Sequence, residues 1–242
     1  MNWRLGARTL GKKALMSTLY PLLRPLVEAV IDADTRNIER WRYRQSLAET
    51  GRFVEEHLPS IQSLRDPAAL LRLAVEHLEE EEGLVCEFGV YTGTSLNQIA
   101  ALLPQTAVWG FDSFTGLPED WRDRFPSGTY AVDALPKTRR NARLQVGLFD
   151  DTLEPFLREH PGWARLLHID CDLYSSTKTV LDAFAARIKP GTVLVFDEFF
   201  NYPGWQEQEY KAFIEFAARE NLSYEYLGYC RYSEQVALKI TG

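Results

Sequence analysis

Two short apolar runs that each end in a pair of acidic residues are the feature that most constrains this fold. The runs occupy residues 166–169 and 193–196. Short runs of this kind are typical of buried strands in a parallel sheet. The acids that follow them are Asp170, Asp172, Asp197 and Glu198. Because ligands bind at the carboxyl edge of such sheets, we expect these four side chains to meet at one site.

The composition bounds the class of protein. The chain has 242 residues, of which 45% are hydrophobic and 25% charged, as in a globular protein. The net charge of −7 argues against a general nucleic-acid-binding protein. Three scattered cysteines predict neither a zinc site nor a disulfide framework, which favours the cytoplasm. No segment is long and apolar enough for a stable membrane anchor, and a homo-oligomer is compatible with the sequence.

Segments of strand and helix character alternate along most of the chain. This order predicts an α/β, Rossmann-like, doubly wound and mostly parallel seven-stranded sheet. The expected strands are residues 84–88, 108–111, 143–148, 165–169, 192–196, 222–227 and 235–240, the last two forming an antiparallel pair. The expected helices are residues 67–82, 94–103, 153–159, 175–187 and 207–220. The long polar and aromatic stretch at residues 113–141 predicts a lid or binding loop.

The N-terminal part differs from the rest in composition, and prolines mark its end. Residues 1–65 are expected to form a helical cap, and residues 66–242 a catalytic domain. For the basic first 30 residues we expect a helix docked on the main domain, and a helix on a membrane surface is the alternative.

A turn with two glycines joins the first expected strand of the sheet to its helix. Gly89 allows a tight turn, and Gly93 lets the backbone approach a ligand at the helix N-terminus. The spacing is neither the dinucleotide-binding fingerprint nor a phosphate loop. Asp112 ends the next strand, where an acid can bind ribose hydroxyls. Glu87 favours a cationic or hydroxyl-bearing ligand over a pyrophosphate.

Four motifs, in order, resemble the macrocin and mycinamicin O-methyltransferase family. They are E-F-G-V-Y-T-G from Glu87, G-F-D-S-F-T-G-L-P from Gly110, H-I-D-C-D-L-Y from His168 and F-D-E-F from Phe196. The resemblance covers residues 83–240 and implies the class I S-adenosylmethionine-dependent fold. The residues that it implies for S-adenosylmethionine are Glu87, Gly89, Tyr91, Gly93, Ser95, Asp112, Ser113, Phe149, Asp150 and Asp170.

The resemblance also implies a divalent cation, Mg²⁺, held by Asp170, Asp197 and Glu198, with Asp172 as general base. Converging carboxylates repel one another unless protons or a cation intervene, which agrees with this assignment. Glu198 stands where the family commonly has Asp, and its longer side chain would shift the metal. The sequence therefore predicts an O-methyltransferase that acts on a hydroxyl of a small-molecule acceptor, a sugar or other natural product.

Two alternatives stay open at this point. The D-x-D motif also occurs in metal-dependent nucleotide-sugar glycosyltransferases, although that class leaves the glycine turn and Asp112 unexplained. A non-catalytic S-adenosylmethionine-binding protein would retain the same cofactor residues.

Other residues allow a functional or a structural interpretation. His168 is expected to be a buried strand histidine bonded to a neighbour. Asp170 and Asp172 could instead cap the helix that follows them. Tyr202 and Trp205 would form either an acceptor wall or loop packing. Tyr174 could line the pocket or pack on the following helix, and the candidate lid contacts are Trp121, Arg122, Phe125 and Tyr130.

Overall fold

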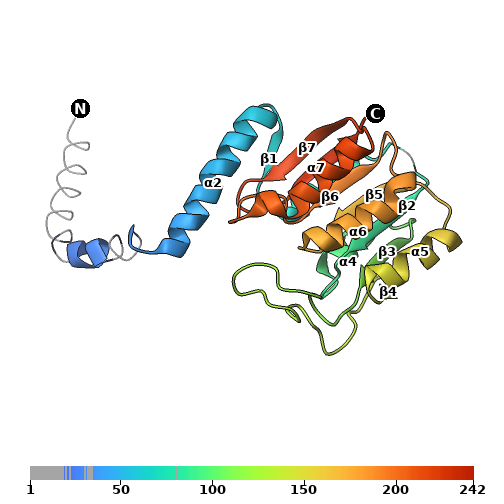
Figure 1. The fold of residues 1–242 in the computed structure, drawn as a ribbon, viewed down its shortest axis with the longest axis horizontal. Coiled ribbons are helices and arrows are strands. Elements are labelled where there is room, and N and C mark those ends of the chain that lie inside the picture. Colours follow the sequence, from blue (N-terminus) through green and yellow to red (C-terminus); the bar gives the residue numbers. More distant parts are fainter. Residues whose placement is uncertain (1–18, 20, 22, 30, 32–34, 80) are drawn as a thin grey trace, which may run out of the picture. The chain divides into compact units, whose positions relative to one another are not determined.

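The described part of the chain falls into two units. The computed structural model describes residues 19, 21, 23–29, 31, 35–79 and 81–242 (Figure 1). The chain divides into Met1–Gln45 and Ser46–Gly242, and helix α2 (Ile38–His57) crosses this boundary. The described residues between 19 and 31 are helical, but most of the expected N-terminal helix lies outside the described residues. Among the described residues, no helix combines the length and the apolar character needed to cross a membrane.

The second unit contains one sheet whose strand order is β1-β7-β8-β6-β5-β2-β3-β4. Its strands are β1 (Gln62–Leu64), β2 (Leu84–Phe88), β3 (Val108–Asp112), β4 (Ala142–Val146), β5 (Ala164–Ile169), β6 (Val193–Phe196), β7 (Tyr224–Cys230) and β8 (Val236–Ile240). Strand β8 is antiparallel to β6 and β7, and the remaining pairs are parallel. The predicted fold class and its seven strands are confirmed.

The eighth strand is the main departure from the sequence prediction. Strand β1 lies in the segment expected to be helical, and it pairs in parallel with β7. The Arg231 N–H donates to the Leu64 carbonyl at 3.0 Å, which continues this pairing beyond the strand. A three-residue strand shows no periodicity in the sequence, so only the neighbouring strand determines its conformation.

Helices cover both faces of the sheet. The helices α3 (Pro67–Glu76) and α4 (Thr94–Leu102) pack in one apolar cluster. The helices α5 (Phe149–Glu159), α6 (Tyr174–Phe184) and α7 (Glu209–Arg219) lie together on the other face (Figure 1). Helix α3 begins where predicted, because Asp66 accepts the Ala69 N–H at 2.9 Å and Pro67 occupies the first turn.

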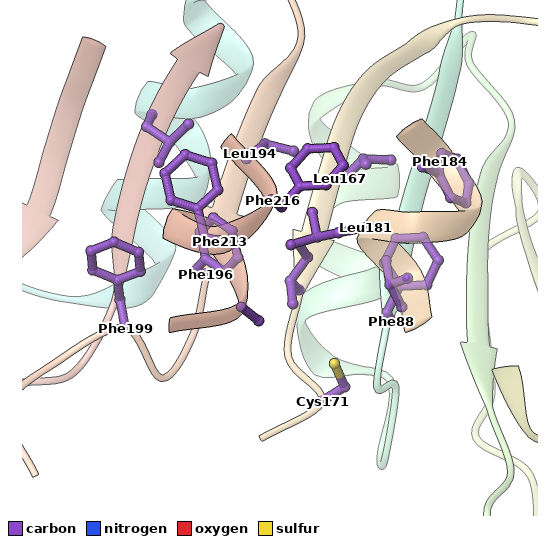
Figure 2. Close-up of a cluster of buried hydrophobic side chains, with 14 of the residues drawn as sticks. Phe88, Leu167, Cys171, Leu181, Phe184, Leu194, Phe196, Phe199, Phe213 and Phe216 are labelled. Carbon is purple, nitrogen blue, oxygen red and sulfur yellow. The ribbon is translucent and has the colours of Figure 1, made fainter. Parts of the chain in front are cut away.

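The core holds the central strands in place beneath α6 and α7. Figure 2 shows the strand residues Phe88, Leu167 and Phe196 facing the helix residues Phe184 and Phe213. All five side chains are fully buried. Burying each of these side chains stabilises the folded state by about 1.5–3 kcal/mol. The packed core therefore fixes the positions of the carboxyl ends of β2, β5 and β6.

Candidate active site

The carboxyl ends of four neighbouring strands lie at the same level of the sheet. Phe88 pairs with Phe111 and with Ile169, and Ile169 pairs with Phe196. The residues that follow these strand positions are Gly89, Asp112, Asp170 and Asp197. The order of the strands reverses between β2 and β5, which is the position where open α/β sheets bind ligands.

A cavity of about 480 Å³ opens at this edge, within the size range of small-molecule sites. The sequence-predicted site residues that line it are Gly89, Tyr91, Asp112, Ser113, Phe149, Asp150, Asp170, Asp172, Asp197 and Glu198. The cavity is also bordered by the loop at residues 113–141, through Gly116–Glu119 and Tyr130, and by the start of α6. The structure thus brings the predicted cofactor and acidic residues to one place, while their individual roles stay predictions.

Three of the predicted cofactor residues do not line this cavity. Glu87 is fully buried in β2, and this burial raises the pKa of its carboxyl, although His168 and then Ser95 lower it. Gly93 is the N-cap residue of α4 and has a φ of 78°, and a Cβ there would lie 3.1 Å from the Pro136 side chain. Gly93 therefore lets the long loop approach the helix.

The turn at Gly89 brings two strand ends into very close contact. Gly89 has a φ of +90°, and a Cβ at this position would lie 1.6 Å from the Asp170 carbonyl oxygen. The two turns are further connected because the Asp170 N–H donates to the Phe88 carbonyl at 2.8 Å. Only glycine fits here, since any side chain would displace the backbone that carries Asp170.

Asp112 organises the same turn. Its Oδ2 accepts the N–H groups of Val90 and Tyr91, both at 2.8 Å, and its Oδ1 accepts the Phe114 N–H at 2.7 Å. A carboxylate has about four acceptor positions, so these bonds leave roughly one for a ligand hydroxyl. Asp112 therefore has a structural function that the sequence interpretation missed, beside its predicted contact with a ribose.

The acids after β5 and β6 crowd one another. Burial and then the charge of Asp197 raise the pKa of Asp170 well above its usual range. Burial, followed by Asp197 and Asp172, does the same for the pKa of Glu198. Burial raises the pKa of Asp172 to about 7, although nearby Arg122 lowers it. Such a cluster is stabilised by whatever reduces its negative charge, either protons or a cation.

His168 connects this cluster to Glu87. The Nδ1 of His168 lies 2.9 Å from Glu87 Oε1, and its Nε2 lies 3.7 Å from Asp197 Oδ1. Burial alone would lower the pKa of His168, but bonds and charges of Asp197 and Glu87 raise it overall. The prediction of a buried strand histidine bonded to a neighbour is confirmed. One nitrogen of His168 and one oxygen each of Asp170 and Asp197 lie within 4.8 Å of one another, and this group does not include Glu198.

Two residues that the sequence interpretation missed hold the acidic pair after β6. Gln235 Nε2 donates to Asp197 Oδ2 at 3.0 Å. Glu209, which is fully buried, accepts the Glu198 N–H at 3.1 Å. The sequence could have indicated that Glu209 is buried, because it lies on the apolar face of α7 that also carries Ala212, Phe213 and Phe216. An acid on an apolar stripe needs a buried partner.

The structural interpretation holds for several other residues. Leu173 precedes α6 without a side-chain cap, so neither Asp170 nor Asp172 caps this helix. Tyr202 and Trp205 are buried and lie outside the cavity lining, which makes them loop packing. The Tyr174 hydroxyl donates to Glu215 of α7 at 2.6 Å and is likewise not in the lining.

The long loop between β3 and β4 is held by Arg122. Its Nη1 donates to both carboxylate oxygens of Glu234, at 3.2 and 3.1 Å. Its guanidinium also lies over the rings of Trp121 and Tyr202, 3.9 and 4.4 Å from their centroids. Of the predicted lid contacts, Tyr130 alone lines the cavity, where its ring meets Tyr91 edge to face at 5.4 Å.

We expect Arg122→Ala to loosen this loop. The variant loses both ring contacts and leaves Glu234 unpaired in a half-buried position, which should cost about 1–3 kcal/mol. Limited proteolysis followed by mass spectrometry should then show faster cleavage within residues 113–141. Arg140→Ala, at an exposed position of the same loop, is the control. Equal cleavage rates in the two variants would refute the role of Arg122.

Comparisons with known proteins agree with this geometry. Residues 86–199 match a family described as a methyltransferase domain. The 8-demethyl-8-(2,3-dimethoxy-alpha-L-rhamnosyl)-tetracenomycin-C 4'-O-methyltransferase of Streptomyces olivaceus is 31% identical over 147 residues. The alignment covers 48% of this chain and 53% of that protein, so the chain spans about half the length of the curated relative.

Solved methyltransferases share the fold. The calicheamicin methyltransferase CalS11 has a TM-score of 0.55 at 24% identity, over 84% of this chain and 93% of that one. The O-methyltransferase NovP has a TM-score of 0.57 at 21% identity, over 72% of this chain and 79% of that one. The resemblance to methyltransferases and the fold that it implied are therefore confirmed.

Proposed function

We propose that this chain, a relative of methyltransferases through residues 86–199, is an S-adenosylmethionine-dependent O-methyltransferase. Its acceptor would be a hydroxyl on a sugar or another small natural product. The observation that carries the proposal is the meeting, in one cavity, of the Gly89 turn with four carboxylates. One relative supports the acceptor class, since it is named as acting on a rhamnosyl group.

The cofactor half of the cavity fits S-adenosylmethionine. The backbone at Gly89 lies open to the cavity, without a side chain between it and a ligand. Three backbone N–H groups occupy most acceptor positions of Asp112, and the remaining position would accept a ribose hydroxyl. Phe149 and Asp150 line the part of the cavity next to β4, where we place the adenine.

The acidic half fits a divalent cation such as Mg²⁺. Asp170, Asp197 and Glu198 offer only oxygen ligands, which hard cations prefer. Among the described residues, the buried Oε2 of Glu198 has no hydrogen-bond partner. An unpaired buried carboxylate oxygen is costly, and a cation would satisfy it. His168, which is bonded to Glu87 and lies beside Asp197, would orient Asp197 rather than bind the metal.

The chemistry then needs one proton acceptor. When bound, S-adenosylmethionine supplies an electrophilic methyl group, and a cation would lower the pKa of the acceptor hydroxyl. Asp172 would take the hydroxyl proton on a carboxylate oxygen while the hydroxyl oxygen bonds to the methyl carbon. The electron pair of the broken carbon–sulfur bond stays on sulfur. Asp172 lies in the cavity wall, and burial places its pKa near 7, where a general base is effective.

Ligand-induced stabilisation tests the cofactor. S-adenosylmethionine or S-adenosylhomocysteine should raise the melting temperature, because a ligand bound only to the folded state stabilises it by mass action. NAD and UDP-sugars should leave it unchanged. Calorimetry that detects UDP-sugar and no S-adenosylmethionine would contradict the proposal and favour a glycosyltransferase. Binding of S-adenosylmethionine without labelled methyl transfer to any acceptor in a mass-spectrometric screen would favour a non-catalytic protein.

Chelation tests the cation. We expect excess chelator to abolish methyl transfer and Mg²⁺ to restore it. Mn²⁺ titration followed by electron paramagnetic resonance should show a site that Asp197→Asn weakens. Glu154→Gln, an exposed acid on α5, is the control for the loss of one charge. Full activity in chelator, or Mn²⁺ binding that is unaltered in Asp197→Asn, would remove the metal from the proposal.

A further inference from the structure

The charged side chains that line the cavity are all acids. They are Asp112, Glu119, Asp150, Asp170, Asp172, Asp197 and Glu198. Within the part of the chain that the structure describes, no lysine, arginine or histidine belongs to this lining. The remaining polar side chains are neutral, namely the hydroxyls of Tyr91, Ser113, Tyr130, Ser175, Ser176 and Thr179 and the thiol of Cys171. The described part of the wall therefore offers hydrogen bonds to neutral groups but no cationic side chain that could pair with an anionic ligand.

Two cationic groups act on these acids, Arg122 on Asp172 and His168 on Asp170, and both already have partners. Arg122 is paired with Glu234 and lies against the rings of Trp121 and Tyr202, outside the lining. His168 is buried behind the acids and bonded to Glu87. Neither could reach a phosphate or carboxylate in the cavity without giving up its present partners.

The entrance has the same character as the interior. Glu119, in the loop at residues 113–141, accepts a hydrogen bond from the Ser175 hydroxyl at 2.5 Å. Both residues are exposed, and together they border the cavity between the loop and α6. An acceptor entering here first meets a carboxylate. Of the lining acids, Glu119 and Asp172 are the two that the proposed function assigns neither to the cofactor nor to the cation, so they face the acceptor.

We infer that this site selects its acceptor by charge. It takes an uncharged or cationic glycoside, and it rejects acceptors with a carboxylate or phosphate near the reacting hydroxyl, nucleoside diphosphate sugars included. The inference rests on the proposed function and specifies its substrate class. Its physical basis is that like charges repel strongly in a partly desolvated cavity, whereas hydroxyl groups and ammonium groups meet suitable acceptors throughout the wall.

A ladder of acceptors that differ in charge tests the inference. The probes are p-nitrophenyl glycosides of a hexose, its amino hexose and its hexuronic acid, in the gluco and galacto series, with the nucleoside diphosphate hexoses. Methyl transfer and calorimetric binding to the protein loaded with S-adenosylhomocysteine and Mg²⁺ are both measured. We expect kcat/KM and affinity for the uncharged and amino glycosides to exceed those for the anionic probes by at least about 30-fold. This factor corresponds to about 2 kcal/mol.

Variants at the entrance sharpen the test. Glu119→Lys should raise the ratio of hexuronide to uncharged glycoside several-fold, in turnover and in binding. Glu154→Lys makes the same change of charge on the exposed face of α5, outside the cavity, and should leave this ratio unaltered.

The outcomes separate this inference from the function on which it rests. The charge selection is wrong if the hexuronide or the nucleoside diphosphate hexose matches the uncharged glycoside in affinity or in kcat/KM. This holds even where methyl transfer confirms the proposed function. If no probe is methylated, the proposed function fails for these sugars, and the binding ranking still decides the charge selection. Binding by none of the probes overturns both.

Discussion

Gly89→Ala is expected to be among the most damaging single substitutions in this protein. The new Cβ would lie 1.6 Å from the Asp170 carbonyl oxygen and 2.7 Å from its carbonyl carbon. These are backbone atoms, so relief requires the end of β5 to move away from β2. The left-handed φ of +90° adds about 1–2 kcal/mol of strain for alanine. Together with the overlap, we expect a loss of roughly 3–5 kcal/mol in the free energy of unfolding.

Gly128→Ala is the matched control for this experiment. Gly128 has a nearly identical φ of +85°, but a Cβ there would meet no atom within 4 Å. Its cost should therefore be the conformational strain alone, about 1–2 kcal/mol. Urea unfolding of the two variants measures the difference, and calorimetry should show that Gly89→Ala also loses S-adenosylmethionine binding. Equal destabilisation by the two substitutions would show that the strand ends do not constrain each other.

The second large effect is expected at Asp172. Asp172→Asn should lower kcat by about 10²–10⁴-fold, the usual consequence of removing a general base. Asparagine is the appropriate substitution because Asp172 has a left-handed φ of 65°, which Asn tolerates well. Melting temperature and affinity for S-adenosylmethionine should therefore stay close to those of the parent protein.

Asp170→Asn is the comparison that separates a base from a metal ligand. It should weaken cation binding, and activity should recover partly at higher Mg²⁺ concentration, whereas Asp172→Asn should show no such recovery. The two residues flank Cys171 and lie in the same turn, so nonspecific damage would affect them alike. If both variants respond to Mg²⁺ in the same way, or if Asp172→Asn is fully active, the proposed division of roles is wrong.

Much of the fold could be predicted because it depends on local signals. Strands β2, β5 and β6 are short apolar runs, and α3 has both an N-cap and a proline at its start. Some observed helix boundaries differ from the predicted ones where the sequence has no clear capping residue. Helix α3 ends at Glu76 rather than at residue 82, and α5 starts at Phe149 rather than at residue 153. The strand β1 was missed because it exists only through its partner β7.

In the candidate site, too, some residues could be predicted from the sequence and others could not. The acids at the ends of β5 and β6 and the glycine turn after β2 were predictable, since a parallel sheet places the ends of its strands at one edge. The supports of these residues were not predictable. Gln235 reaches Asp197 across 38 positions of the chain, and His168 reaches Glu87 across 81. Such pairs leave no spacing pattern in a single sequence.

By itself, the sequence determined which residues reach the carboxyl edge of the sheet, because strand periodicity and turn chemistry are properties of neighbouring residues. Only the tertiary structure decided what each of them does there. It turned Glu87 inward onto His168, gave Asp112 three backbone N–H partners, and held Arg122 away from the cavity. The reason is that each donor, acceptor and charged group interacts with the groups that the folded structure places next to it. Which of these partners a side chain has is determined only when segments that are distant in the sequence pack together.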